Sequence, residues 1–246
     1  MKIKRFLVFI LVIILLALLS IYYPKLTGKV VSGLDRDYEK ESCFVNRVID
    51  GDTLVCDNQT IRLLGVNTPE KNKPYYLEAK EFLSKTENQT IYILRDSEDI
   101  DKYERKLRYV FYEDELVNVL ILQRGLATSF MLENLKYEEK LKVAENYAQR
   151  SELGLWIKSK EVCAGCLELL ELNYTGEFFI IKNNCDFKCD LTDWSVKDDA
   201  NHFFKLESLD AKQEKRYDSK TKIWNDDGDR FFMRDNYGKL IVFYEY

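Results

Sequence analysis

The sequence predicts an α+β region followed by an all-β region, both preceded by an apolar N-terminal segment. Three observations predict this organisation. Short strand-like runs alternate with helical patterns up to about residue 160, strand-like runs alone continue to residue 246, and an uncharged stretch of eighteen residues lies within the first 23 residues. The chain has 246 residues, of which 46% are hydrophobic, so it is long enough for one large domain or two small domains with hydrophobic cores.

The N-terminal segment, residues 1–23, is predicted to direct the chain to a membrane. "MKIKR" precedes "FLVFILVIILLALLSIYY", which is long enough to reach across a bilayer. Because basic residues concentrate before this run, we expect a cytoplasmic N-terminus, a single-pass anchor in the cell membrane and the remaining chain outside. A cleaved signal peptide is the alternative, and the protein would then be secreted. Residues 24–42 are predicted to be a linker, since they combine turn formers with mixed charge.

Charge and histidine content limit the possible functions. The net charge is −5, divided as +4 over residues 1–40, −3 over 41–160 and −6 over 161–246. A general basic surface for nucleic acid is therefore absent, and a polyanion would have to bind at a local cluster. His202 is the only histidine, which argues against a Ser-His-Asp triad and a multi-histidine zinc site.

Residues 43–160 are predicted to form the α+β domain. Three strands, "CFVNRVI", "TLVC" and "TIRLLGV", come first, with Asp-Gly between the first two as a hairpin signal. A helix over "YYLEAKEFLSK", strands "TIYIL" and "KLRYVFY", a helix over "ELVNVLILQRGLA" ending at Gly125 and a helix over roughly Lys136 to Gln149 follow. Five strands with a helix between the third and fourth is the order of an OB-type five-stranded β-barrel with added helices.

Residues 161–246 are predicted to form a second, all-β domain. The runs "LELLELN", "GEFFIIKN", "WSVKD", "HFFKL", "RFFMRD" and "KLIVFYEY" are each bounded by Asn, Asp or Gly and lack helical spacing. Short strands at such intervals predict a β-sandwich. Trp194 and Trp224 are expected in its core.

Charged residues at the ends of predicted strands form a candidate site. The stretch "VIDGDTLVCDNQTIRLLGVNTPE", Val48 to Glu70, carries Asp52, Arg62 and Glu70, and "DKYERKLRYV" places a second arginine before another strand. Taken singly, an Asp-Gly is usually only a turn and a strand arginine usually an edge charge. Two arginine-bearing segments can, however, converge on one cleft.

Such a cleft could hydrolyse a phosphodiester. This reaction needs a divalent cation held by oxygen ligands, a base for the attacking water and fixed positive charge at the phosphorane. Oxygen ligands suit calcium, whereas no cysteine or histidine lies near to suit zinc. The residues available are Asp52, Asn67 and Thr68 as oxygen ligands, Glu70 as base, and Arg62 and Arg105 as bidentate phosphate ligands.

The motifs "VIDGDT…IRLLGVNTPE…DKYERKLRYV…VNVLILQRGLA" closely resemble the staphylococcal nuclease, or thermonuclease-like, family from about Cys43 to Trp156. The resemblance implies an OB barrel with helices and a nuclease that hydrolyses DNA or RNA with Ca²⁺. It also implies roles for single residues: catalysis for Arg62, Glu70 and Arg105, calcium binding for Asp52, Asn67 and the Thr68 carbonyl, and a place near the terminal phosphate of the nucleotide for Lys102 and Tyr103.

Three positions depart from the family pattern. Asn67 stands where the family typically has aspartate. Asparagine keeps an oxygen ligand but removes one negative charge, so we expect weaker calcium binding, with a dissociation constant of about 0.1 to 1 mM. Glu104 replaces a common glycine beside Arg105. The segment that covers the nucleobase of the substrate in the founding member of the family reads "ATSFMLENL" here, so a preference for particular nucleobases does not carry over.

The six cysteines of an exported chain predict disulfides. Cys43 and Cys56 flank the Asp-Gly turn, so a cross-strand disulfide is plausible. "CAGC" and "CDFKC" have a spacing near that of four-cysteine zinc sites, which is the alternative to disulfides. The four residues of these two motifs are Cys163, Cys166, Cys185 and Cys189.

The segment from about Leu167 to Tyr246 resembles the lamin-tail domain, an immunoglobulin-like β-sandwich. "FFIIKN", "DLTDWSVKD" and "IWNDDGDRFFMRDNYGKL" carry the resemblance. It implies a binding or positioning role for this domain, toward a partner that the sequence does not identify.

The whole sequence predicts a membrane-anchored, outward-facing, calcium-dependent nuclease. Two alternatives stay open. One is a non-catalytic OB module that binds nucleic acid or protein, which the complete set of Arg62, Glu70 and Arg105 opposes. The other is a surface adhesion or scaffold protein that works through the β-sandwich.

Overall fold

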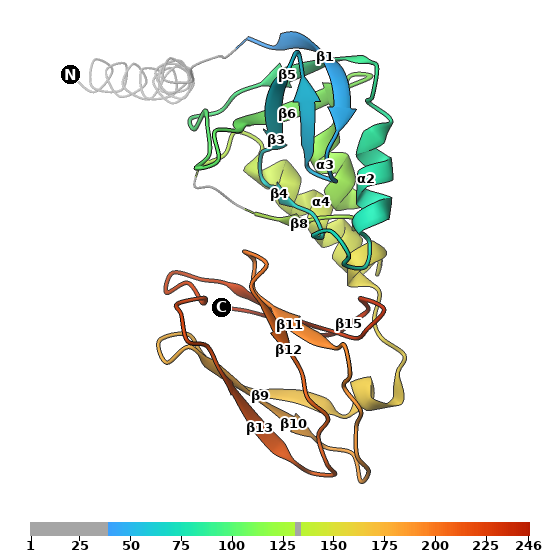
Figure 1. Ribbon diagram of the computed structural model, residues 1–246, viewed down its shortest axis with the longest axis vertical. Coiled ribbons are helices and arrows are strands. Elements are labelled where there is room, and N and C mark those ends of the chain that lie inside the picture. Colours follow the sequence, from blue (N-terminus) through green and yellow to red (C-terminus); the bar gives the residue numbers. More distant parts are fainter. Residues whose placement is uncertain (1–38, 131–133) are drawn as a thin grey trace, which may run out of the picture. The chain divides into compact units, whose positions relative to one another are not determined.

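The computed structural model describes residues 39–130 and 134–246 (Figure 1). The predicted membrane segment, residues 1–23, and most of the predicted linker lie outside these ranges. Within them, no helix is long and apolar enough to cross a bilayer. Residues 40–246 belong to one unit; we call residues 40–158 the barrel region and residues 159–246 the C-terminal region.

A closed, mixed five-stranded barrel forms the barrel region, as the sequence predicts. Its strands are β1 (Glu41–Val48), β2 (Thr53–Cys56), β3 (Gln59–Leu63), β5 (Thr90–Leu94) and β6 (Lys106–Tyr112). Neighbours are antiparallel in the order β3-β2-β1-β5-β6, and a parallel pairing of β3 with β6 closes the barrel. Every strand therefore has a partner on both sides, which removes the exposed edges of an open sheet.

Three helices cover the barrel where helical spacing predicts them. They are α2 (Tyr76–Ser84), α3 (Val117–Gln123) and α4 (Glu138–Arg150). Helix α2 packs against β1 and α3, and α3 packs against β6 and α4 (Figure 1). Gly125 follows α3 with φ of 67°, the left-handed conformation that favours glycine after a helix.

Three two-residue strands were not predicted. β4 (Val66–Asn67) pairs with β8 (Thr128–Ser129), and β7 (Glu115–Leu116) extends the sheet beside β6. Two residues are too short to show an alternating pattern in sequence. The β4–β8 pairing matters here because it anchors the segment that leads from Asn67 to the candidate base.

Two antiparallel sheets form the C-terminal region. The first consists of β13 (Glu214–Asp218), β10 (Phe178–Asn183) and β9 (Leu167–Asn173), in spatial order. The second consists of β12 (Phe203–Lys205), β11 (Ser195–Lys197), β14 (Arg230–Arg234) and β15 (Leu240–Glu245). This agrees with the predicted all-β character, while the immunoglobulin-like and lamin-tail assignments stay predictions.

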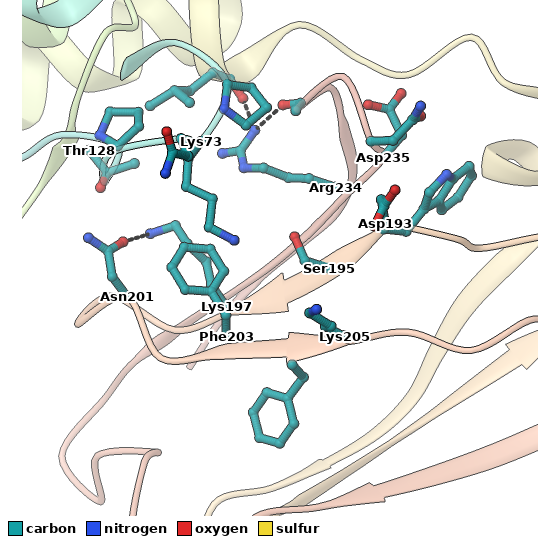
Figure 2. Close-up of a pocket in the computed structure, with 18 of the residues that line it drawn as sticks. Lys73, Thr128, Asp193, Ser195, Lys197, Asn201, Phe203, Lys205, Arg234 and Asp235 are labelled. Carbon is teal, nitrogen blue, oxygen red and sulfur yellow. Dashed lines mark hydrogen bonds between the residues drawn. The ribbon is translucent and has the colours of Figure 1, made fainter. Parts of the chain in front are cut away.

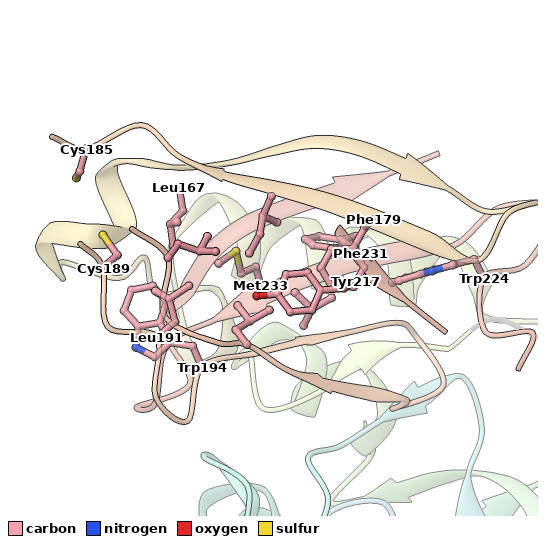
Figure 3. Packing of buried hydrophobic residues seen from close by; sticks show 14 residues of the cluster. Leu167, Phe179, Cys185, Cys189, Leu191, Trp194, Tyr217, Trp224, Phe231 and Met233 are labelled. Carbon is pink, nitrogen blue, oxygen red and sulfur yellow. The ribbon is translucent and has the colours of Figure 1, made fainter. Parts of the chain in front are cut away.

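Side chains of both sheets share one hydrophobic cluster (Figure 3). Phe179 of β10 lies 5.3 Å from Phe231 of β14, ring centre to ring centre, in an edge-to-face arrangement. Trp194 and Trp224 are both buried in this cluster, which confirms their predicted place in the core. Aromatic side chains bury large areas, so this cluster contributes strongly to the stability of the two sheets.

All six cysteines are paired in disulfides. Cys43–Cys56 joins β1 to β2 with a Cα–Cα distance of 5.8 Å, as predicted. The other two bonds are Cys163–Cys189 and Cys166–Cys185, with Cα–Cα distances of 5.7 and 5.2 Å. The cysteine motifs therefore form disulfides, and the zinc alternative loses its thiolate ligands.

A buried ion pair joins the two regions. Arg230 of β14 donates from Nη1 to both carboxylate oxygens of Glu145 on α4 at 2.9 Å, and from Nε to Asp199 at 2.8 Å. Beside it, Trp156 and Phe232 pack in a buried cluster. These contacts place the loop after β11 beside the barrel region.

Candidate active site

The predicted site residues all line one cleft of about 720 Å³. The eight residues are Asp52, Arg62, Asn67, Thr68, Glu70, Lys102, Tyr103 and Arg105. They come from the β1–β2 hairpin, from β3, from β4 and the segment after it, and from the loop before β6. Residues far apart in sequence thus meet where the predicted strands end.

Asp52 ties the hairpin to the segment that carries the other candidate calcium ligands. Its Oδ2 accepts hydrogen bonds from the backbone N of Thr68 at 2.9 Å and from Thr68 Oγ1 at 2.8 Å, and its Oδ1 accepts one from Thr53 Oγ1 at 3.0 Å. A Cβ on Gly51 would lie 2.6 Å from Cβ of Ala79 and 2.9 Å from Cγ2 of Thr68. Glycine at position 51 therefore allows the hairpin to pack closely against Ala79 and Thr68.

Arg62 projects from an interior strand. β3 pairs with both β2 and β6, so the reading of Arg62 as an edge charge is wrong. Its Nη2 lies 3.2 Å from Oδ2 of Asp52 and 3.4 Å from Oδ1 of Asn67, and Nη1 donates to the carbonyl of Leu63 at 2.9 Å. The guanidinium is thus held between two of the candidate calcium ligands.

Arg105 is oriented by a carboxylate in its own loop. Its Nε donates to Oδ2 of Asp101 at 2.7 Å, and Nη1 lies 3.4 Å from Oγ1 of Thr53. Burial opposes ionisation of Asp101, but hydrogen bonds from Arg105 and Tyr103 outweigh it and lower the pKa of this carboxyl. Asp101 was missed in the sequence, although its place four residues before Arg105 is a usable signal. Glu104 has φ of 63°, which explains why glycine would suit this position.

Glu70 is exposed at the cleft and contacts the C-terminal region. Nδ2 of Asn201 lies 3.3 Å from Oε1 of Glu70 and 3.4 Å from Oδ1 of Asn67, and Nδ2 of Asn67 donates to the carbonyl of Asp199 at 2.8 Å. Asn201 and Asp199 lie in the β11–β12 loop. Sequence reasoning missed both, and no local motif marks them.

Lys102 and Tyr103 lie at the rim of the cleft. The Tyr103 side chain is 66% exposed. The Lys102 ammonium lies 5.1 Å and the Arg105 guanidinium carbon 5.3 Å from the centre of its ring. The side chains of Lys102 and Tyr103 can therefore contact a ligand that enters from solvent.

The cleft offers oxygen ligands of low total charge. Asp50 also lines it, and burial together with the charge of Asp52 raises the pKa of Asp50 to about 6. Over residues 39–130 and 134–246 there is no group of three or more His, Cys, Asp or Glu that could hold a metal ion. Asp52, Asn67 and Thr68 provide a carboxylate, an amide and a threonine, and hard oxygen atoms of this kind suit calcium.

Comparisons with known proteins agree with this geometry. The model of the family "Staphylococcal nuclease homologue" matches residues 60–158. The thermonuclease of Staphylococcus intermedius is 39% identical over 132 residues, which cover 49% of this chain and 79% of that protein. The chain belongs to the staphylococcal nuclease family.

Other members of the staphylococcal nuclease family also match this chain. The thermonuclease of Staphylococcus hyicus is 33% identical over 159 residues, covering 60% of this chain and 94% of that protein. An endonuclease of Haemophilus influenzae is 29% identical over 130 residues, covering 50% of this chain and 71% of its own. The protein is therefore a nuclease, that is, a hydrolase of phosphodiester bonds, and the family match ends where the C-terminal region begins.

Proposed function

We propose that this nuclease hydrolyses DNA or RNA in the cleft described above, with Arg62, Arg105 and Glu70 as catalytic residues. The observation that carries the proposal is that two arginines and a carboxylate from separate segments line one cleft together with oxygen ligands suited to a cation. The non-catalytic OB module would have no need for this set.

The two arginines would stabilise the charge that develops on the phosphorane. Asp52 holds Arg62, and Asp101 holds Arg105, so both guanidinium groups are oriented before substrate binds. Preorganised charge of this kind needs no rearrangement during the reaction. Each planar group can also donate two parallel hydrogen bonds to a phosphate.

Glu70 would accept the proton of the attacking water. Its side chain is exposed in the cleft, and the amide of Asn201 contacts one of its oxygens. Lys102 and Tyr103 would position the substrate from the rim, because one offers a charge and the other an exposed ring.

Asp52, Asn67 and Thr68 are the residues that would hold calcium. When bound there, the ion would neutralise charge on a phosphate oxygen. Because asparagine stands in place of a second carboxylate, we expect a calcium dissociation constant of about 0.1 to 1 mM.

We also propose that the protein works outside the cell, anchored by residues 1–23 or released after their cleavage. Three disulfides support this location, since such bonds persist in oxidising compartments. The C-terminal region would be a lamin-tail-like sandwich that binds or positions a ligand.

The test is hydrolysis of single-stranded DNA and RNA by the full chain, with calcium or with a chelator. We expect calcium-dependent cleavage, lowered about 100-fold or more in Glu70→Gln. Glu78→Gln is the matched control, since Glu78 lies in the first turn of α2 and does not line the cleft. Equal cleavage with the chelator would refute the calcium requirement, equal cleavage by Glu70→Gln would refute the base, and binding without cleavage would favour the OB-module alternative.

A further inference from the structure

A second cavity, of about 510 Å³, borders the active-site cleft (Figure 2). Residues of both regions line it, and it shares Asn67, Thr68, Pro69 and Asn201 with the cleft. The two spaces therefore adjoin along a wall formed by residues 67–69 and Asn201. No sequence motif marks this cavity.

Basic side chains dominate its charge. Lys73, Lys197, Lys205 and Arg234 line it, against the carboxylates of Asp193 and Asp235. Figure 2 shows Arg234 on one side of the cavity, with Ser195 and Lys205 on the other.

Three hydrogen-bond donors hold the carboxylate of Asp235. Its carboxylate accepts hydrogen bonds from Ser159 Oγ at 2.7 Å, from Tyr237 N at 2.9 Å and from Lys239 N at 2.8 Å. The excess of positive charge stands out because the C-terminal residues 161–246 carry a net charge of −6.

Arg234 is buried, and no ion pair is formed with it by residues 39–130 or 134–246. Its Nη1 donates to the carbonyls of Leu155 and Gly238, while Nε and Nη2 are buried and have no hydrogen-bond partner. Burial lowers the pKa of Arg234 to about 10, and the nearby charge of Asp235 opposes this effect only in part. A buried, unpaired guanidinium is costly, and an anion bound beside it would remove that cost.

Lys197 lines the same cavity, and its hydrogen-bond acceptors are also uncharged. Its Nζ donates to the carbonyl of Asp198 at 3.1 Å and to Oδ1 of Asn201 at 3.0 Å, both uncharged acceptors. Burial, and then the charge of Arg234, lower its pKa to about 7. A bound anion would oppose both effects and keep the ammonium charged.

We propose that this cavity binds a backbone phosphate of the polynucleotide substrate, next to the phosphate held in the active-site cleft, through Arg234, Lys197 and Lys205. The inference rests on the nuclease function proposed above and adds a substrate-binding role for the C-terminal region. The cavity adjoins the cleft along residues 67–69 and Asn201, so neighbouring phosphates of one strand could lie on either side of this wall. The guanidinium and ammonium groups donate hydrogen bonds that suit phosphate oxygens. Substrates too short to reach this cavity would lose the contact.

The test compares binding of fluorescein-labelled oligothymidylates of two and twelve nucleotides to the full chain in EDTA, measured by fluorescence anisotropy. We expect the parent to bind the 12-mer more tightly than the 2-mer. Lys205→Met should weaken 12-mer binding about threefold to tenfold and lower its salt slope by about 0.7, with 2-mer binding unchanged. Lys197→Met should weaken 12-mer binding by at least as much, since Lys197 also holds Asn201 at the cleft. Lys205 is exposed, so its variant tests the site without a risk to folding. Lys220→Met removes the same charge from an exposed lysine outside the cavity and should leave binding as in the parent.

Four results would overturn the proposal: a parent that binds both lengths equally, cavity variants that match Lys220→Met, equal losses for the 2-mer, or weakened binding of inorganic phosphate with 12-mer binding intact. The third would indicate distortion of the active-site cleft, and the fourth a site for free anions. Failure of the proposed nuclease function is a separate result: no cleavage of either oligonucleotide with calcium, while binding still depends on length.

Discussion

The side-chain amide of Asn201 lies 3.3 Å from a carboxylate oxygen of Glu70, although 131 residues separate the two in the chain. Asn201 is in turn held by Lys197, whose ammonium donates to its Oδ1 at 3.0 Å. The C-terminal region therefore contacts the proposed catalytic base directly. We therefore expect this region to influence catalysis.

Replacing Asn201 by alanine should lower kcat. The change removes the contact that orients Glu70, and loss of one hydrogen bond of about 1 kcal/mol corresponds to a factor of about five. Steady-state kinetics on single-stranded DNA measure the effect. Asn184→Ala is the control, because it removes a similar contact of an exposed amide, with Glu168, at a position that lines neither the cleft nor the second cavity. Unchanged kcat in Asn201→Ala would show that Glu70 is oriented without this amide.

Arg62→Lys and Arg105→Lys should each lower kcat about 100-fold or more, since an ammonium cannot reproduce two parallel hydrogen bonds to a phosphate. Single-turnover cleavage of a labelled oligonucleotide gives the rate. Arg124→Lys makes the same exchange at an exposed arginine outside the cleft and should cleave at the parent rate. Near-parental rates in either cleft variant would remove that arginine from the mechanism.

Asn67→Asp should lower the calcium concentration needed for half-maximal activity about tenfold. The substitution adds a negative charge beside Asp52, and one added carboxylate contributes on the order of 1 kcal/mol or more at this range. Activity titrated with calcium measures the change. Asn88→Asp adds the same charge in an exposed turn away from the cleft and should titrate like the parent. Identical curves for all three proteins would place calcium elsewhere.

Glu145→Gln should destabilise the protein by about 3 kcal/mol. It leaves the buried guanidinium of Arg230 with Asp199 as its only carboxylate partner among the described residues, and breaking a buried pair exposes an uncompensated charge. Urea unfolding measures the free energy of unfolding. Glu139→Gln, at an exposed position on the same helix, should change it by less than about 0.5 kcal/mol. A similar small change in Glu145→Gln would show that the ion pair does not stabilise the junction of the two regions.

Lys197 should make the free energy of unfolding rise between about pH 7 and pH 10. Its pKa is lowered from 10.5 to about 7, so above pH 7 the folded state holds a neutral amine while the unfolded chain still binds the proton. The charged groups that act on it are Arg234, Arg230, Asp199 and Asp198.

In Lys197→Met this rise should be absent, so the variant should be more stable than the parent at pH 6 and lose that advantage by pH 10. The difference is on the order of a few kcal/mol, because each pKa unit corresponds to about 1.4 kcal/mol. Urea unfolding at several pH values measures it. A difference between the two proteins that does not change with pH would show that the Lys197 pKa is ordinary.

Much of the barrel region could be predicted from local patterns. Short strand-like runs marked the five barrel strands, helical spacing marked α2 to α4, and Gly125 marked the end of α3. The eight site residues followed from charged positions at strand ends together with the family motifs, and the structure places all of them in one cleft. Local propensity and motif spacing were sufficient because these features involve residues close in sequence.

Tertiary packing alone decided the rest. The contact of Asn201 with Glu70, the β4–β8 pairing and the cavity around Arg234 join segments that carry no common pattern in sequence. Disulfide connectivity is of the same kind, because four cysteines allow three pairings and only the placement of their strands and loops selects Cys163–Cys189 and Cys166–Cys185. Such contacts depend on which surfaces meet when the elements pack. The sequence around one residue therefore does not identify the distant residue that it will contact.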